Sequence, residues 1–270
     1  MDLFVGLWIF ALGAIIGSFL NVVIHRFPRE ESIVFPPSRC PRCGARIRPW
    51  DNVPIVSWLI LLGRCRDCRS PIAVRYPLVE LANGLFWLAA WLHLGLTLSA
   101  LLVALAVSMT IALIFIDAEI QILPDVIDLP GIAVGLGIGW LGAGLARPHL
   151  VLSSSLLDSI LGAAFGAGLL LAVALAYRLI RGIEGMGLGD VKMIAMIGAV
   201  CGWAAVLPVI FLASVVGAVI GIAIALRKDE GLRFALPFGV FLGLAFLGVL
   251  FFGRVIQEWY FGFLTVALVR

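Results

Sequence analysis

Charged residues are scarce in this chain of 270 residues. Asp, Glu, Lys and Arg together make up 13% of it, whereas 63% of the residues are hydrophobic. A soluble domain does not need so much apolar surface, and runs of 18 or more uncharged apolar residues recur, each long enough to cross a bilayer. The scarcity of charge therefore excludes a soluble globular protein and predicts an all-α polytopic membrane protein.

Motifs that would identify several other classes of protein are missing as well. The sequence contains neither a Walker phosphate-binding loop nor a Gly-x-Gly-x-x-Gly stretch after a strand. It has no His-Glu-x-x-His, so a zinc metalloprotease has no candidate site. There is no internal repeat and no low-complexity tract, and nothing predicts a nucleic-acid partner.

The apolar runs predict the membrane spans. The first run lacks a preceding basic residue and a small-residue cleavage site, so we expect a retained span rather than a signal peptide. The run 193–226 would form a single helix of about 51 Å, longer than the apolar thickness of a bilayer. Two short spans with a turn near residues 203–208 fit better. We therefore predict about eight transmembrane helices: 3–24, 76–96, 97–116, 126–145, 159–180, the two halves of 193–226, and 234–253.

Basic residues are distributed unevenly over the expected loops. The segment 25–75 carries ten of the seventeen arginines. If this segment lies in the cytoplasm, alternation of the spans places sixteen of the nineteen basic residues inside, in agreement with the positive-inside rule. We therefore expect three parts: a first transmembrane helix over residues 1–24, a small cytoplasmic domain over 25–75, and a transmembrane domain over 76–270.

Four of the five cysteines lie in the expected cytoplasmic domain as two Cys-x-x-Cys pairs, with 21 residues between them: Cys40 with Cys43, and Cys65 with Cys68. This spacing is typical of a tetrahedral four-thiolate zinc site, which supplies most of the folding energy of a short domain. Four protein ligands leave no open position for catalysis, so the zinc would be structural. Two disulfides are the competing interpretation, but they require an oxidising compartment.

Two acidic clusters share the same cytoplasmic depth in this topology. Asp117, Glu119 and Asp125 lie between the third and fourth spans, and Glu184 and Asp190 lie between the fifth and sixth. Asp117 ends an apolar run. Asp190 follows three alternating glycines and comes shortly before another apolar run. Two such carboxyl groups, brought together, cannot both ionise at low cost, and the pair can activate a water for aspartyl proteolysis. The simpler alternative is that each caps a helix or pairs with a basic residue.

These motifs, in this order, resemble the type IV prepilin peptidases, which are membrane aspartyl proteases of the GxGD kind. Residues 17–26 are similar to the end of the family's first span, and residues 40–80 resemble its cysteine-bearing domain. Residues 116–125 resemble the first catalytic motif, and residues 185–192 resemble the second. The resemblance implies that Asp117 and Asp190 are the catalytic pair, with Asp125 as the next candidate for the first aspartate.

The resemblance further implies an enzyme that removes the short basic leader of type IV prepilins or type II secretion pseudopilins at the cytoplasmic face of the inner membrane. Its partners would be these substrates and the lipid bilayer. Members with the cysteine-bearing domain often also methylate the new N-terminus with S-adenosylmethionine. A rival interpretation is a zinc-stapled membrane transport or assembly protein that uses its intramembrane acids, such as Glu80 and Asp128, as ion ligands.

Overall fold

The computed structural model describes residues 2–146, 150–183, 186–227 and 236–268. The regular elements in these ranges are helices, accompanied by two isolated antiparallel bridges in the polar segment. The all-helical character predicted from the sequence is therefore confirmed. The chain forms two compact units, Met1–Ala112 and Leu113–Arg270, and the division between them falls inside one helix.

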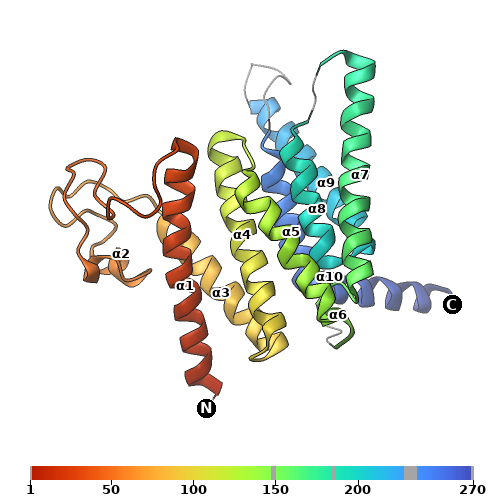
Figure 1. The fold of residues 1–270 in the computed structure, drawn as a ribbon, viewed down its shortest axis with the longest axis horizontal. Helices are drawn as coiled ribbons and strands as arrows, with labels where there is room; N and C mark the ends of the chain where they lie inside the picture. Colours follow the sequence, from red (N-terminus) through yellow and green to blue (C-terminus); the bar gives the residue numbers. More distant parts are fainter. Residues whose placement is uncertain (1, 147–149, 184–185, 228–235, 269–270) are drawn as a thin grey trace. The chain divides into compact units, whose positions relative to one another are not determined.

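Each expected span overlaps a helix of the structure (Figure 1), although the expected span 126–145 is divided between two helices, α5 and α6. The helices in chain order are α1 (Asp2–Arg26), η1 (Phe27–Arg29), η2 (Pro49–Asp51), α2 (Val56–Ile60), α3 (Arg75–Leu94), α4 (Leu98–Ile120), α5 (Asp125–Trp140), α6 (Ala143–Ala146), α7 (Leu156–Arg181), α8 (Leu188–Cys201), α9 (Trp203–Arg227) and α10 (Phe238–Leu268).

Within the described residues, four helices are long and apolar enough to cross a membrane: Asp2–Arg29, Leu98–Ile120, Leu156–Arg181 and Trp203–Leu226. These helices support a membrane protein. The total of eight spans stays a prediction, as do the domain boundaries at residues 24 and 75.

Buried polar groups join the helices of the first unit, in which α1 packs on α3. Asn83 of α3 donates a hydrogen bond to the Gly13 carbonyl at 2.7 Å, and Asn21 of α1 donates one to the Tyr76 carbonyl at 3.1 Å. Ser108 of α4 extends this network by donating to Asn83 Oδ1 at 2.8 Å. Such interhelical hydrogen bonds stabilise packing in lipid, where the hydrophobic effect between helices is absent.

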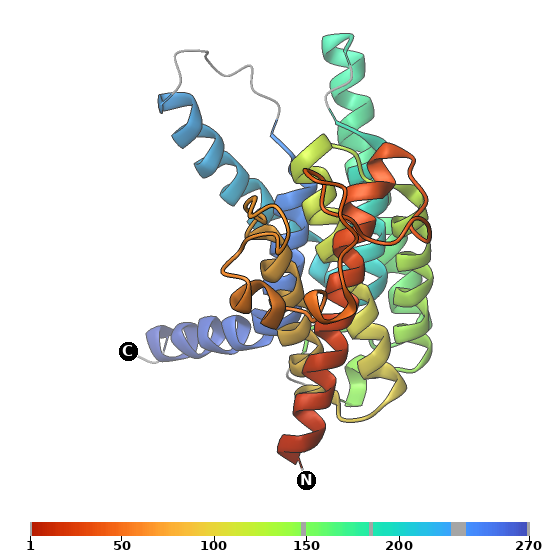
Figure 2. The same cartoon turned by 90° about the vertical axis from the view of Figure 1, so that its left-hand side faces the viewer.

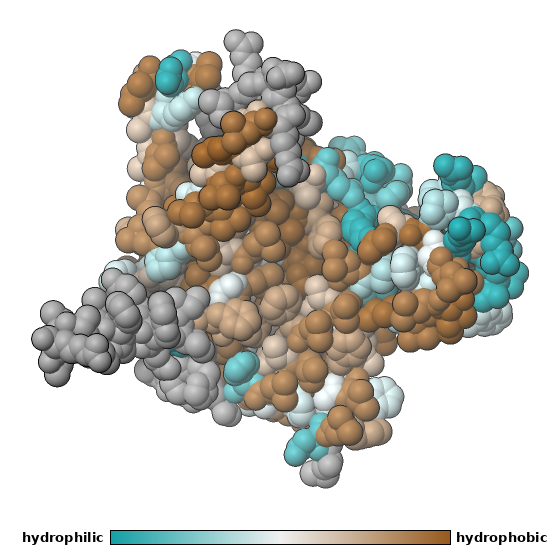
Figure 3. Space-filling view, turned by 180° about the vertical axis from the view of Figure 1, so that it is seen from behind, coloured by the Kyte–Doolittle hydropathy of each residue, from teal (hydrophilic) through white to brown (hydrophobic). Residues whose placement is uncertain are grey.

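The segment between α1 and α3 is the polar part of the first unit. Figure 3 shows hydrophilic side chains gathered over it, whereas hydrophobic side chains cover the helices. Glu80 of α3 ties this segment to the helices, because its Oε2 accepts a hydrogen bond from the Ile55 N–H at 2.7 Å. Glu80 is therefore a buried acid with a structural partner, which weakens the case for it as an ion ligand.

Close backbone contacts hold α8 in the middle of the second unit. A β-carbon on Gly162 of α7 would lie 2.1 Å from the Gly198 carbonyl oxygen of α8, and one on Gly198 would lie 2.2 Å from the Gly162 carbonyl oxygen. Gly135 of α5 approaches Ala199 of α8 in a similar way. Small residues of this kind allow helix backbones to meet in a membrane. Residues 193–201 of α8 are all buried as a result.

The long uncharged run is divided into two helices, as expected, at a point just before the predicted range. α8 ends at Cys201, Gly202 has φ +83°, and α9 begins at Trp203. Asp158 of α7 fixes this break, because its Oδ1 accepts a hydrogen bond from the Trp203 N–H at 3.3 Å. Local sequence could not place the turn, since the stabilising partner is 45 positions away.

The last helix, α10, packs on α8 and α9. Figure 2 shows its C-terminal part, in dark blue, extending sideways from the other helices of its unit. Parts of the sequence interpretation fall outside the described residues: positions 184–185, with the acid Glu184; positions 228–233, with the basic residues Lys228 and Arg233; and positions 234–235 of the last expected span.

Candidate active site and metal centre

The four paired cysteines meet in the polar segment of the first unit. Their Sγ atoms all lie within 4.8 Å of one another, and those of Cys40 and Cys68 are 3.8 Å apart. A tetrahedral site with metal–sulfur bonds of about 2.3 Å has sulfur–sulfur edges of about 3.8 Å. A disulfide requires about 2.05 Å, and all four thiols are free. The arrangement fits a metal ion rather than two disulfides.

Both cysteine pairs adopt the same local backbone fold. In each, the N–H of the first cysteine donates to the carbonyl five residues later, and the N–H four residues later donates back to the carbonyl of the first cysteine. These bonds, which begin at Cys40 and Cys65, are between 2.8 and 3.0 Å long. The residue after the second cysteine is left-handed in both cases, with φ +72° at Gly44 and +59° at Arg69. The two halves of the site are therefore built locally, and the tertiary fold brings them together.

Nearby donors already stabilise negative charge on part of this cluster. The N–H of Cys43 lowers the pKa of Cys40 to about 6, against the opposing effect of burial. The hydroxyl and N–H of Ser70 lower the pKa of Cys68. At Cys43 a backbone N–H acts to lower the pKa, but desolvation and the other three thiols outweigh it and raise the pKa to about 12. A bound cation would let all four sulfurs ionise together, which is the usual behaviour of a zinc thiolate site.

A second cluster forms in the second unit, where the last turn of α4 and the first turns of α5, α8 and α10 lie at the same end (Figure 1). Asp117, near the end of α4, is 5% exposed, and its Oδ2 accepts a hydrogen bond from the Val240 N–H of α10 at 3.0 Å. Asp190 is in the first turn of α8 and half-buried. The charge of Asp117 acts on Asp190, so the two carboxyl groups are electrostatic neighbours.

The side chain of Leu123 links the surroundings of these two acids. A β-carbon on Gly189, the residue before Asp190, would lie 2.8 Å from Leu123 Cβ. A β-carbon on Gly239 would lie 3.0 Å from Leu123 Cδ1 and 2.9 Å from Asp117 Oδ2. Both glycines are therefore needed for the close approach that brings α8 and α10 to the end of α4.

The other acids near this cluster have different environments. Asp125, at the start of α5, is exposed and forms an ion pair with Lys192 of α8, with Oδ1 and Nζ 2.6 Å apart. Asp128 is 0% exposed, and neither of its carboxylate oxygens has a hydrogen-bond partner among the described residues. The simpler alternative from the sequence, that each acid caps a helix or pairs with a basic residue, applies in part. Asp117 does accept a hydrogen bond from a helix N-terminus, but that helix is α10, which is distant in the sequence.

Sequence reasoning missed the contribution of residues 236–240. A proline followed two positions later by a glycine, Pro237 and Gly239, at the start of the last apolar run was the available signal. Its role depends on a contact with Asp117 across 123 positions, which no local pattern reveals.

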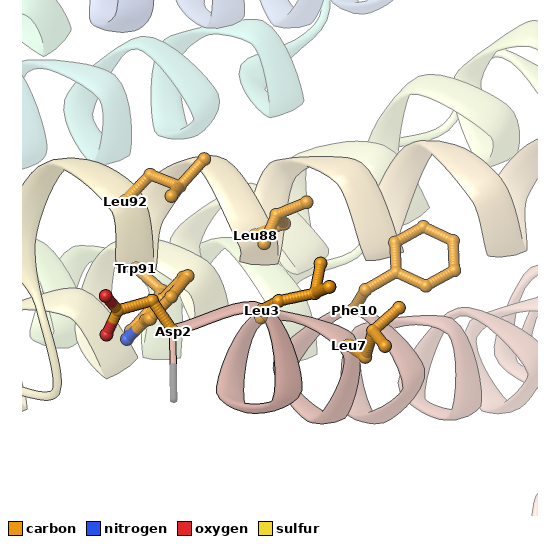
Figure 4. A pocket seen from close by; sticks show the side chains of 8 residues that line it. Asp2, Leu3, Leu7, Phe10, Leu88, Trp91 and Leu92 are labelled. Atoms are coloured by element: carbon orange, nitrogen blue, oxygen red, sulfur yellow. The ribbon is translucent and has the colours of Figure 1, made fainter.

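An apolar groove lies between α1 and α3 in the first unit (Figure 4). Its lining consists of Asp2, Leu3, Gly6, Leu7, Phe10, Leu88, Trp91 and Leu92. Only Asp2 in this set carries an ionisable side chain, so the groove lacks the paired groups that acid–base catalysis requires.

Comparison with known proteins gives consistent matches over most of the chain. Residues 11–94 match the profile of the Bacterial Peptidase A24 N-terminal domain, and residues 104–222 match that of the Type IV leader peptidase family. The prepilin leader peptidase/N-methyltransferase of Pseudomonas aeruginosa is 39% identical over 93% of this chain and 92% of its own length. Its counterpart in Aeromonas hydrophila is 37% identical over 93% of this chain and 92% of its own length. No solved structure matches the chain.

Proposed function

This chain belongs to the type IV leader peptidase family and is a peptidase, and we propose that it removes the leader from type IV prepilins or type II secretion pseudopilins. The names of its relatives support this substrate class. The substrate would itself be membrane-bound, with a short basic leader that ends in glycine before an apolar helix. The relatives' names also support a second step, in which the new N-terminal amine is methylated with S-adenosylmethionine.

The catalytic pair in this proposal is Asp117 and Asp190. The observation that carries it is their common environment: the end of α4 and the start of α8 both border Leu123, and the charge of one acid acts on the other. Paired carboxyl groups with restricted access to water can share one proton, so one can accept a proton while the other donates one. That combination is what peptide hydrolysis by water requires.

In the proposed reaction, one carboxylate takes a proton from a water molecule whose oxygen attacks the scissile carbonyl carbon. The other carboxyl group then protonates the leaving amine. The glycine stretch before Asp190 would admit the substrate backbone. Among the described residues, a β-carbon on Gly187 would meet nothing nearer than the Gly189 nitrogen at 3.9 Å, so these residues leave space beside Gly187.

Asp125 is the weaker candidate for the first aspartate. It is exposed and already paired with Lys192 at 2.6 Å, whereas Asp117 is buried and within electrostatic range of Asp190. The ion pair instead fits a role in joining α5 to α8.

Cleavage would take place at the cytoplasmic face of the inner membrane. The distribution of basic residues over the predicted loops supports this orientation. Glu119, in the last turn of α4, would attract a basic leader toward the site.

The four-cysteine site would hold zinc through the thiolates of Cys40, Cys43, Cys65 and Cys68. When bound, zinc supplies folding free energy and, with four protein ligands, leaves no open position for a substrate. Its role in this proposal is to fold the polar segment.

The test uses Asp117→Asn and Asp190→Asn, with Asp125→Asn as the matched control. Each full-length variant is incubated in membranes with a prepilin, and cleavage is followed by a gel shift, while the metal content reports the folded state. We expect the first two variants to be inactive and the control to cleave. Activity in Asp117→Asn together with its loss in Asp125→Asn would make Asp125 the first aspartate. Failure of the unmodified protein to cleave prepilins or pseudopilins would refute the proposal.

A further inference from the structure

The start of α10 holds the carboxyl group of Asp117. The Val240 N–H donates to Asp117 Oδ2 at 3.0 Å, and a β-carbon on the preceding Gly239 would lie 2.9 Å from the same oxygen. Asp117 is only 5% exposed, so water scarcely competes with this contact. The Asp117 side chain therefore occupies the place of an N-terminal cap on a helix to which it does not belong.

The first turn of a helix favours a negative charge for two reasons. Its N–H groups have no partners within the helix, and the aligned peptide dipoles leave a partial positive charge at that end. Hydrogen bonds from N–H groups to an ionised carboxylate are also stronger than bonds between neutral groups. Residues 238–253 of α10 include no charged side chain, so the α10 backbone is the source of this effect.

Asp190 has different surroundings. It is half-buried, and no described residue forms a hydrogen bond with its carboxyl group. Lys192, two positions later, is engaged with Asp125 at 2.6 Å. The other titratable groups on α4 and α5 are acids, Glu119 of α4 and Asp128 of α5. Their negative charge opposes a second carboxylate at this end of the unit.

We propose that the first turn of α10 keeps Asp117 ionised, so that Asp117 is the general base and Asp190 is the general acid. Gly239 and Val240 are then positioning residues that act through Asp117. This assignment rests on the proposed function, because it concerns the same pair of acids.

The assignment gives a balanced reaction. Asp117 takes a proton from water as the water oxygen bonds to the scissile carbonyl carbon. Asp190 gives its proton to the leaving nitrogen as the carbon–nitrogen bond breaks. After the products leave, the proton on Asp117 passes to Asp190, which restores the starting state.

The first test compares Gly239→Ala with Gly248→Ala in membranes that contain the full chain. Gly248 lies on the same helix, and among the described residues a β-carbon there would meet only Leu212 Cδ2 at 3.9 Å. The pH dependence of kcat/KM is measured with a prepilin substrate. We expect Gly239→Ala to move the acid limb to higher pH by about one unit, because the ionised base loses part of its hydrogen bonding. The loss is then about tenfold on the acid side and below about twofold at the plateau. Gly248→Ala leaves both limbs in place.

Val240→Pro is a second variant in case Gly239→Ala does not fold. Proline lacks the N–H from which Asp117 accepts, and the first turn of a helix tolerates proline better than its interior. The same shift of the acid limb is expected. An equal loss at every pH would mean that the α10 start has only a structural role. A shift of the basic limb would mean that Asp117 is the acid. Either result overturns the assignment.

The aspartate variants separate this inference from the proposed function. If Asp117→Asn or Asp190→Asn still cleaves, the catalytic pair itself is wrong. If both are inactive while Gly239→Ala and Val240→Pro keep the unmodified pH profile, only the assignment of base and acid is wrong.

Discussion

The contact between α7 and α8 gives the sharpest prediction about stability and activity. A β-carbon on Gly162 would lie 2.1 Å from the Gly198 carbonyl oxygen and 2.8 Å from the Gly202 carbonyl carbon. Both neighbours are backbone atoms, so they cannot rotate away. An ordinary carbon–oxygen contact needs about 3.3 Å, so Gly162→Ala has to separate the two helices by about 1 Å.

The expected loss of stability follows from the packing of the two helices, and the expected loss of activity follows from the position of Asp190. Forcing an extra methyl group into a packed interface costs about 1–3 kcal/mol, and this site is at the upper end because no side chain can adjust. Asp190 is near the start of α8, the helix that contains Gly198. It lies eight residues before Gly198 and is therefore about 12 Å away along the helix axis. Displacement of a catalytic group by about 1 Å costs about 100-fold in rate. We therefore expect Gly162→Ala to lose about 3 kcal/mol of unfolding free energy and about 100-fold in kcat/KM.

The helix that contains Gly162, α7, offers a matched control. A β-carbon on Gly168 of α7 would meet no atom of the described residues within 4 Å. Gly168→Ala should keep full cleavage and gain up to about 1 kcal/mol, because alanine favours the helix more than glycine does. Denaturant midpoints and cleavage rates of the two variants, measured in the same detergent, provide the comparison. Equal stability and equal activity in Gly162→Ala and Gly168→Ala would refute the reasoning.

Three further predictions concern the metal site and a buried acid. Cys65→Ser should reduce bound metal from about one ion per chain to almost none and expose the polar segment to limited proteolysis, and retention of the metal would contradict the four-thiolate site. Arg69→Gly should stabilise the polar segment by about 1 kcal/mol, because glycine tolerates the positive φ at this position. Gly44→Ala, at φ +72°, should destabilise the segment by a similar amount. Thermal unfolding midpoints that shift in the same direction in both variants would contradict this. Asp128→Leu should raise the unfolding free energy by about 1 kcal/mol or more and leave cleavage unchanged, because it removes a buried carboxyl group that has no hydrogen-bond partner among the described residues; loss of cleavage would show that this acid takes part in function.

Asp128, which has no hydrogen-bond partner in the part of the chain that the structure describes, is also relevant to the transport interpretation. A protein that binds ions through intramembrane acids should depend on such a residue, whereas a peptidase that uses Asp117 and Asp190 should not. Glu80, the other acid suggested for that role, already accepts a hydrogen bond from Ile55. The Asp128→Leu variant therefore discriminates between the two interpretations.

Some features of this protein followed from the sequence by itself, because they depend on composition or on spacing over a few residues. With 63% hydrophobic residues and 13% charged residues, the chain has the composition of a helical membrane protein. The two cysteine pairs are another case. The turn that presents each pair is closed by hydrogen bonds within six residues, so the Cys-x-x-Cys spacing was enough to predict it. Asp117 and Asp190 were likewise predicted at a helix end and a helix start, and both positions are confirmed.

Only the tertiary structure decided which groups these residues contact. Lys192 pairs with Asp125 across 67 positions, and Val240 donates to Asp117 across 123. The break at Gly202 depends on Asp158 in another helix. The apolar runs in the sequence determine which segments become helices, but they do not determine which helix ends meet. That choice depends on close backbone packing, as at Gly162 and Gly198, where contacts far apart in sequence bring the ends of α4, α8 and α10 together.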